Sequence, residues 1–154
     1  MGSCGDCRGS PDQQQNIFFI QTEIPQTIPF VTGIETTVLT LPVQITGNVV
    51  PVLINGLVQM QITLPQGLTF YQYGIRLRIR RNGNLLFTQT MLTSNDNTPN
   101  LTHTHIHTIP ISIVDNNPAP GNNIYTITLE YYQQSSATIT VTAQSRTINA
   151  LLTV

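Results

Sequence analysis

From Ile17 onward, apolar and polar residues alternate in short runs that are separated by turn-forming residues. Most runs are rich in β-branched and aromatic residues and have the two-residue period of a strand with one buried face. No segment of useful length places apolar residues at the roughly 3.6-residue spacing of an amphipathic helix. We therefore expect about eight to ten strands and no helix. The expected strands are IFFIQTEI, ETTVLTLPVQIT, VVPVLI, LVQMQITL, YGIRLRIRR, NLLFTQTMLT, the run from His103 to Val114, NIYTITLEYYQ and ATITVTAQSRTINALLTV.

Two Asn-Gly pairs punctuate this pattern, Asn55-Gly56 and Asn82-Gly83. An Asn-Gly pair between alternating apolar runs is the strongest short-range signal for a tight hairpin, because both residues accept the positive φ angles of a type I′ turn. We therefore expect one hairpin between VVPVLI and LVQMQITL, and a second between YGIRLRIRR and NLLFTQTMLT.

Many short strands with regular turn signals, in a chain of 154 residues, indicate a sandwich or a closed barrel. We predict an all-β fold over residues 17–154, a single jelly roll of about eight antiparallel strands. An immunoglobulin-like sandwich is the alternative, but its Cys…Trp…Cys signature is missing because the chain has no Trp. Pro42, Pro51 and Pro110 fall among the expected strands, where each should mark an edge, a bulge or a strand end.

Residues 1–16, MGSCGDCRGSPDQQQN, contain almost no apolar side chains and hold both cysteines of the chain. We expect an extended N-terminal connector that spans up to about 50 Å at ~3.3 Å per residue. The segment has neither the basic start nor the apolar run of a secretory signal. No stretch of the chain approaches the roughly 20 apolar residues of a membrane-spanning helix. We therefore expect a protein made without a classical signal peptide and with no membrane partner.

Only 8% of the residues are charged, against about 25% in a typical globular protein. All six basic residues are Arg, and the formal net charge is -1. Such a field neither attracts nor repels nucleic acid strongly, so no nucleic-acid partner is expected. A nearly uncharged surface rich in Thr, Asn and Gln resists self-association only weakly. The composition therefore favours a protein that assembles with copies of itself.

Cys4 and Cys7 form a C-G-D-C motif in the N-terminal connector. A redox pair would need a helix N-terminus after a strand, which this segment does not offer. Half of a zinc knuckle would need two further ligands, which only the histidines could supply. Free thiols, or a bridge within the connector, are a third interpretation. Disulfides to a neighbouring subunit are the favoured one, because a polar connector carries its thiols away from the core and a covalent bridge keeps the neighbour at high local concentration.

All three histidines lie in the run LTHTHIHTIPIS, and His103, His105 and His107 share one face of the expected strand. The favoured interpretation is a solvent-facing or interface row of imidazoles opposite a Thr/Ile face. A metal site shared between subunits, or with the cysteines, is a second. A protonation-sensitive interface is a third, because neighbouring imidazoles repel once charged.

A metal-dependent enzyme of the cupin type would use an H-x-H pair such as His103 and His105. It would also need a Glu a few residues later and a third His on a later strand. No carboxylate follows before Asp115, and no histidine lies beyond His107. We therefore expect neither an enzyme nor a bound cofactor or metal.

The run from Ile75 to Arg80 alternates apolar residues with Arg76, Arg78 and Arg80, and Arg81 extends the basic cluster. Binding of a polyanion usually brings more lysine and exposed aromatic residues, which are missing here. The favoured interpretation is an outer strand face whose arginines pair with carboxylates of a neighbouring strand or subunit. Arg76, Arg78 and Arg80 are therefore interface candidates, together with His103, His105 and His107.

A lysine-free, Thr/Asn/Gln-rich jelly roll behind a connector with Cys4-x-x-Cys7 resembles the subunits of bacterial endospore appendages. The resemblance implies that the connector reaches into neighbouring subunits and that Cys4 and Cys7 cross-link them. Because residues 17–154 contain no cysteine, such bridges would join connector to connector. More loosely, the run NIYTITLEYY resembles the C1q/TNF-like jelly rolls of spore-surface proteins. The spore setting also reconciles disulfides with the lack of an export signal, because a mother-cell protein oxidises after lysis.

The leading hypothesis is a structural, self-assembling subunit of a disulfide-stabilised extracellular fibre on a spore or cell surface. Its partners would be copies of itself, with an anchoring or tip protein as a further candidate. The alternative hypothesis is a binding module, either a trimeric C1q/TNF-like head or a receptor-binding head of the phage-fibre type. A discrete trimer in solution would distinguish that head from a polymer.

Overall fold

The computed structural model describes residues 17–46, 50–96, 100–135 and 138–152. The described residues form nine strands and no helix. The strands are β1 (Ile17–Thr22), β2 (Gln26–Ile28), β3 (Thr36–Ile45), β4 (Val52–Leu64), β5 (Phe70–Arg81), β6 (Asn84–Asp96), β7 (His103–Asp115), β8 (Gly121–Gln134) and β9 (Thr140–Leu152). The expected number of strands is confirmed. The expected connector, residues 1–16, lies outside the described residues, so the domain boundary stays a prediction.

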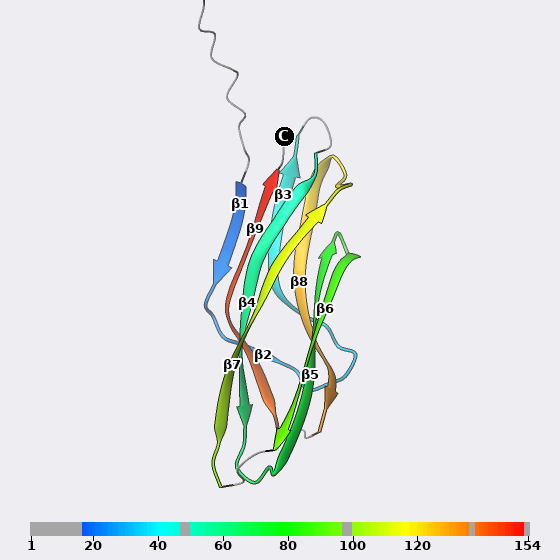
Figure 1. The fold of residues 1–154 in the computed structure, drawn as a ribbon. Helices are drawn as coiled ribbons and strands as arrows, with labels where there is room; N and C mark the ends of the chain where they lie inside the picture. The colour runs from blue at the N-terminus through cyan, green and yellow to red at the C-terminus, as the bar shows by residue number, and fades with distance from the viewer. Residues whose placement is uncertain (1–16, 47–49, 97–99, 136–137, 153–154) are drawn as a thin grey trace, which may run out of the picture.

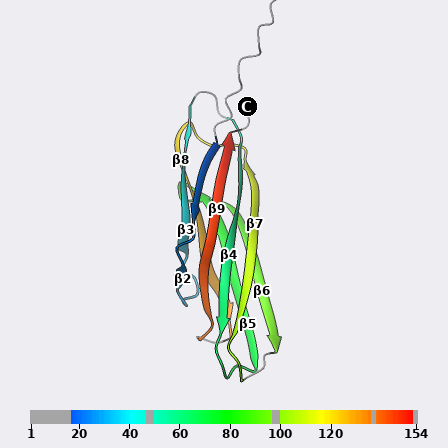
Figure 2. The same cartoon turned by 90° about the vertical axis from the view of Figure 1, so that its left-hand side faces the viewer.

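The strands form two antiparallel sheets that pack face to face (Figure 1). One sheet has the order β1-β9-β4-β7, and β2 pairs with β9 further along the same edge. Figure 2 shows these four strands side by side, in front of the second sheet. The second sheet has the order β3-β8-β5-β6. From β2 onward, only the β5–β6 connection stays within one sheet, which is the two-sheet order of a jelly roll. The predicted fold class is confirmed.

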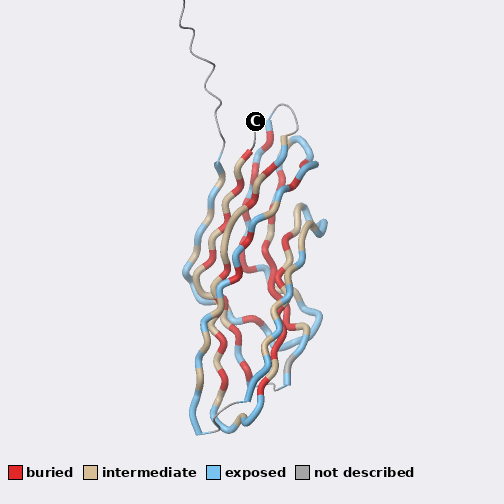
Figure 3. Tube along the Cα trace, in the orientation of Figure 1, coloured by how far each residue is buried: buried red, intermediate tan, exposed pale blue. Residues whose placement is uncertain are grey.

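The core lies between the sheets, because alternate residues of each strand point inward (Figure 3). In β4 every second residue from Val52 to Leu64 is buried, except at Gly56. Side chains of this size contribute about 1.5–3 kcal/mol each when they are removed from water. The core also contains Tyr71, Tyr73, Tyr125 and Tyr131, and burial raises the pKa of both Tyr125 and Tyr131. The largest fully buried side chains include Tyr73, Tyr125, Tyr131, Ile54, Met60, Ile62, Ile75, Leu77 and Ile79.

The predicted hairpin at Asn82-Gly83 is confirmed. Asn82 has φ 49° and Gly83 has φ 84°, so both residues take the positive φ that a type I′ turn needs. The Asn82 backbone N–H donates to the Ile124 carbonyl at 2.9 Å, and the Asn82 side-chain oxygen accepts from the Ile124 N–H at 2.8 Å. The turn is thereby fixed to the neighbouring strand β8.

The predicted hairpin at Asn55-Gly56 is wrong, because β4 runs straight through this pair from Val52 to Leu64. Gly56 lies opposite Ile148 of β9 on one side. A Cβ atom at Gly56 would overlap the Thr147 carbonyl oxygen and lie 3.1 Å from the Ile148 Cα. The glycine therefore permits a close approach of β9 and does not form a turn.

The three prolines lie where a missing N–H is tolerated. Pro42 is in β3 and Pro110 is in β7, and each of these strands is the edge of its sheet. Pro51 directly precedes β4. The expectation for all three is confirmed. The short strand β2 has no counterpart among the expected strands, because three residues cannot display a period.

Candidate functional site

Arg76, Arg78 and Arg80 project from the outer face of β5, as the alternating pattern predicts. The residues between them, Ile75, Leu77 and Ile79, are fully buried in the core. The predicted division of this strand into an apolar and a basic face is therefore confirmed.

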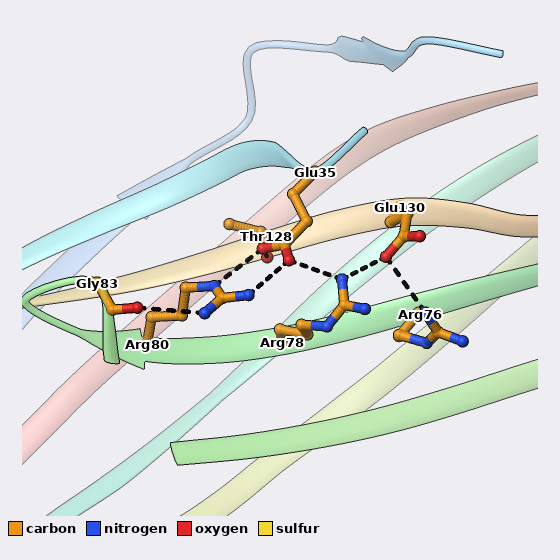
Figure 4. A network of polar contacts seen from close by, with 7 residues as sticks. All are labelled: Glu35, Arg76, Arg78, Arg80, Gly83, Thr128 and Glu130. Atoms are coloured by element: carbon orange, nitrogen blue, oxygen red, sulfur yellow. Dashed lines mark hydrogen bonds and ion pairs between the residues drawn. The ribbon is translucent and has the colours of Figure 1, made fainter. Parts of the chain in front are cut away.

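Two carboxylates link the three arginines into one network (Figure 4). Arg80 donates to both Glu35 oxygens, from Nη2 at 2.6 Å and from Nε at 3.0 Å. Arg78 Nη1 donates to Glu35 at 2.8 Å and also to Glu130. Arg76 Nη1 lies 3.5 Å from the same Glu130 oxygen. Glu130 is on the neighbouring strand β8, and Glu35 precedes β3, so the arginines pair with carboxylates of their own chain.

Glu35 is the most strongly perturbed carboxyl of this network. The hydrogen bond from Arg80 is the largest effect that lowers its pKa, and burial opposes it. A hydrogen bond from Thr128 Oγ1 at 2.8 Å and the charge of Arg78 lower it further. Together these effects lower the pKa of Glu35 to about 2. Glu35 thus remains ionised well into acid, and it joins β5, β8 and the start of β3.

We expect the Glu35 network to make the fold sensitive to strong acid. The pKa of Glu35 is lower in the folded chain than in the unfolded chain, so its ionisation stabilises the fold above about pH 4.5. This contribution should be lost as the pH falls from about 4.5 to about 2. Urea unfolding at several pH values measures the effect. The variant Glu35→Gln should be less stable at pH 7 and should lose this part of the pH dependence; an unchanged acid profile would contradict the network.

Tyr132 extends the outer face beyond Arg76. The Arg76 guanidinium lies 4.9 Å from the centre of the Tyr132 ring. A Cβ atom at Gly74 would meet the same ring at 2.7 Å, so the absence of a side chain there gives the tyrosine room to lie flat on β5. This cation–π contact holds Arg76, the most exposed of the three arginines, in place.

The prediction that Arg81 extends the same basic cluster is wrong. Its Nη1 donates to Asp115 Oδ2 at 2.6 Å and to the Asn117 carbonyl at 2.7 Å. The Tyr125 hydroxyl donates to the same Asp115 oxygen at 2.8 Å. Arg81 directly follows Arg80, so the same two-residue alternation turns its side chain to the inner face of β5. Arg81 therefore joins a separate cluster that ties β5, β7 and β8 together.

The histidine row lies on the inner face of β7, so the solvent-facing form of the expected row is wrong, and its role as an interface row stays a prediction. His103, His105 and His107 are half-buried, whereas Ile106 on the opposite face is 55% exposed. The inner face continues into the buried Ile109. Polar imidazoles are expected on the outer face of a strand and isoleucine on the inner face. In this part of β7 the two are exchanged, because the histidines face inward and Ile106 faces outward.

The histidines contact tyrosines that reach across from β5 in the other sheet. The Tyr73 hydroxyl and His107 Nε2 are hydrogen-bonded at 2.9 Å. The His105 and Tyr71 rings are 5.8 Å apart, and the Tyr71 and Tyr73 rings stack at 6.0 Å. Tyr71 and Tyr73 are functional candidates that sequence reasoning missed. Their alternation on β5 opposite the histidines could be found only once the two strands were known to face each other.

Two imidazole nitrogens in this row, His103 Nε2 and His105 Nε2, are buried and have no hydrogen-bond partner in the described structure. Across the described ranges, no group of three His, Cys, Asp or Glu side chains could hold a metal ion. A metal site shared between subunits would need further ligands from a neighbouring copy or from the cysteines, which lie outside the described residues.

A row of apolar side chains crosses the outer face of the β1-β9-β4-β7 sheet. Its members are in register: Ile17 lies opposite Leu151, Leu151 opposite Leu53, and Leu53 opposite Val114. Ile17 is 66% exposed and Val114 is 52% exposed. We call these four residues the apolar row. Sequence reasoning missed it, because each member looks like an ordinary strand residue until the register is known.

The apolar row begins at Ile17, the residue to which the connector is attached, and the C-terminal end of β9 lies at the same end of the sandwich (Figure 1). The strands at the sheet edges, β1 and β7 in one sheet and β3 and β6 in the other, each have one strand partner in the described structure. Such edges present unpaired backbone groups on which another chain can align.

No described helix has the length and hydropathy required to cross a membrane. The chain matches no family model and no curated protein. Among solved structures, it is similar to the VP2 subviral particle protein of infectious bursal disease virus, with 11% identity and a TM-score of 0.47 over 91% of this chain and 33% of that chain.

A second similar structure is that of the T=1 particles derived from infectious bursal virus, with 7% identity and a TM-score of 0.49 over 91% of this chain and 32% of that one. The protein of the Gx strain of infectious bursal disease virus has 12% identity and a TM-score of 0.46, over 99% of this chain and 37% of that one. The chain thus spans about a third of the length of these viral proteins. The identities and TM-scores are too low to assign a shared family or to transfer a function.

Proposed function

We propose that the protein is a structural subunit that self-assembles into a disulfide-stabilised extracellular fibre. Residues 1–16 of each copy dock on a neighbouring copy, and Cys4 and Cys7 lock the joint. The location on a spore or cell surface follows from the resemblance to endospore appendage subunits. A discrete trimeric binding head is the competing function.

The observation that carries this proposal is the apolar row at the root of the connector. A connector that leaves Ile17 starts at a line of apolar side chains that crosses all four strands at one end of the β1-β9-β4-β7 sheet. Burial of this row against a second copy would remove apolar surface from water, at about 25 cal/mol per Å². A contact between the row of one copy and a different surface of the next is heterologous, and a heterologous contact builds filaments or rings.

The weak charge of the chain also supports assembly. Glu35 and Glu130 offset two of the three charges of Arg76, Arg78 and Arg80 within the same chain, so little net charge is left to keep copies apart. The arginines and histidines named above as interface candidates stay predictions. An arginine face in contact with a neighbour would present guanidinium groups that are already paired within their own chain.

We expect deletion of residues 1–16 to leave a folded β domain that no longer forms fibres. The described strands begin at Ile17, and their sheet pairs and core are made within residues 17–152, so the deletion removes none of these contacts. Circular dichroism checks the fold, and light scattering checks the mass. Fibres that form equally well without these residues would contradict the role of the connector.

The apolar row can be tested by a matched pair of single variants in the full chain. Val114→Asn changes the row, and Leu92→Asn changes an outward residue of β6 with almost the same exposure, 53% against 52%. Both should leave the fold intact, and only Val114→Asn should weaken assembly. Equal assembly of the two variants would exclude the row as the contact, and a discrete trimer would favour the binding head.

A further inference from the structure

The histidine row and the two facing tyrosines form a half-buried polar cluster between the two sheets. The residues directly opposite the histidines on β4 are Met60, Ile62 and Leu64, all fully buried. Across the sandwich, Tyr71 is 5% exposed and Tyr73 is fully buried. The imidazoles therefore have apolar neighbours on their own sheet and neutral phenols on the other.

No acidic side chain faces this cluster from the strands that pack against it. β4 carries no titratable residue. On β5, Arg76, Arg78 and Arg80 point to the outer face, away from the histidines. Arg81 forms an ion pair with Asp115. On β6 the one acidic residue is Asp96, an exposed residue at the end of the strand opposite Phe70. A proton taken up by the histidines would thus be neither paired nor well solvated.

The polar contacts of the row differ from one imidazole to the next. His107 Nε2 is engaged by the Tyr73 hydroxyl, while the Nε2 atoms of His103 and His105 are buried without a partner. Burial lowers the pKa of His107, and the nearby His105 lowers it further. The His105 and His107 rings are 6.5 Å apart, so two adjacent protonated rings would also repel each other.

We propose that the histidine row is an acid-sensitive latch that holds the edge strand β7 against β5 and releases it when the imidazoles become protonated. In the tautomer whose Nε2 accepts from the Tyr73 hydroxyl, protonation of His107 removes that acceptor. Protonation of the row also places uncompensated positive charge between the sheets. The end of β7 with the histidines then separates from the core, while Arg81 and Asp115 keep its other end attached.

The sign of the pH dependence follows from the lowered pKa. In the unfolded chain His107 takes up a proton near the ordinary histidine pKa of about 6.5, and in the folded chain it does so only at lower pH. The stability that neutral His107 contributes should therefore be complete above about pH 7 and decrease below pH 6.5 until His107 of the folded chain is protonated. Each pKa unit of lowering corresponds to a tenfold change in the unfolding equilibrium constant, about 1.4 kcal/mol.

The test uses the full chain under reducing conditions. Exchange of the histidine C2 hydrogen, followed by mass spectrometry of peptides, gives the pKa of each imidazole. Backbone hydrogen exchange at pH 5 and pH 7.5, corrected for the intrinsic rate, reports opening of the strands. We expect a pKa below 6.5 for His107 and a loss of protection at pH 5 that is confined to the histidine half of β7 and the facing part of β5.

The variant with all three histidines changed to Gln is the control, because these are the only histidines of the chain. Gln retains hydrogen bonding and does not titrate, so this variant should show the same protection of β7 at both pH values. If the variant does not fold, the measurements on the unchanged chain still decide. A pKa of His107 at or above 6.5, or equal protection of β7 at pH 5 and 7.5, would overturn the latch. The histidine pKa values and the protection of β7 are properties of each single copy. They can therefore be measured even if the protein does not assemble into fibres.

Discussion

Replacing Gly56 with Ala should be among the most damaging single-methyl changes in the chain, with a loss of about 3 kcal/mol in the free energy of unfolding. The added Cβ atom would overlap the Thr147 carbonyl oxygen, which belongs to the backbone of β9. β4 is an interior strand, paired with β7 on one side and β9 on the other. A backbone held on both sides cannot move away as a flexible side chain would. Chemical denaturation of the full chain measures the loss.

The neighbouring variant Asn55→Ala is the control for this prediction. Asn55 lies on the other face of β4, and its side chain accepts a hydrogen bond from Ser112 Oγ at 2.9 Å. Its loss should cost only about 0.5–1.5 kcal/mol. A loss below about 1 kcal/mol for Gly56→Ala would mean that β9 does not approach β4 so closely.

Replacing Glu130 with Ala should cost about 3 kcal/mol, because the change removes one partner of a mostly buried ion pair. The Glu130 side chain is 5% exposed, and its carboxylate is shared by Arg76 and Arg78. Without it, Arg78 keeps only Glu35, and Arg76 keeps only the face of the Tyr132 ring. The cost is the energy of leaving positive charge enclosed without a counter-charge.

Two further variants separate this effect from simple loss of a side chain. Glu23→Ala removes an exposed glutamate whose hydrogen bond to Gln21 is long, 3.4 Å, and should change stability by less than about 0.5 kcal/mol. The double variant Glu130→Met with Arg78→Met should recover much of the loss, because apolar residues can replace a buried pair. Equal losses for Glu130→Ala and Glu23→Ala would show that the network contributes nothing to stability.

The fold was predictable where the strand period and the turn chemistry agree. The hairpin at Asn82-Gly83 and the edge positions of Pro42 and Pro110 follow from backbone constraints that act within a few residues. Gly56 shows the limit of this reasoning. Asn55-Gly56 is the same dipeptide as in the true turn, but here the glycine is needed for the close approach of β9, about ninety residues away in the sequence. No local pattern reveals such a contact.

The sequence predicted which residues form the candidate sites and that they share one face of a strand. It did not predict which other side chains surround them. The alternation in β5 placed its arginines on one face, yet their partner Glu35 comes from a segment that only the sheet order brings close. The histidines were placed on one face, but which face was buried depended on their pairing with the apolar residues of β4. The apolar row needs the register of four strands, so single-strand reasoning cannot detect it.

The central claim is that the first sixteen residues join copies of one rigid β domain. The most direct measurement is electron microscopy of the purified full chain, combined with denaturing gels of the same sample with and without reductant. We predict fibres, and a ladder of high-mass bands that collapses to a single band after reduction and is absent when Cys4 and Cys7 are replaced by Ser. Discrete particles of fixed mass, with one monomer band in the absence of reductant, would contradict the claim.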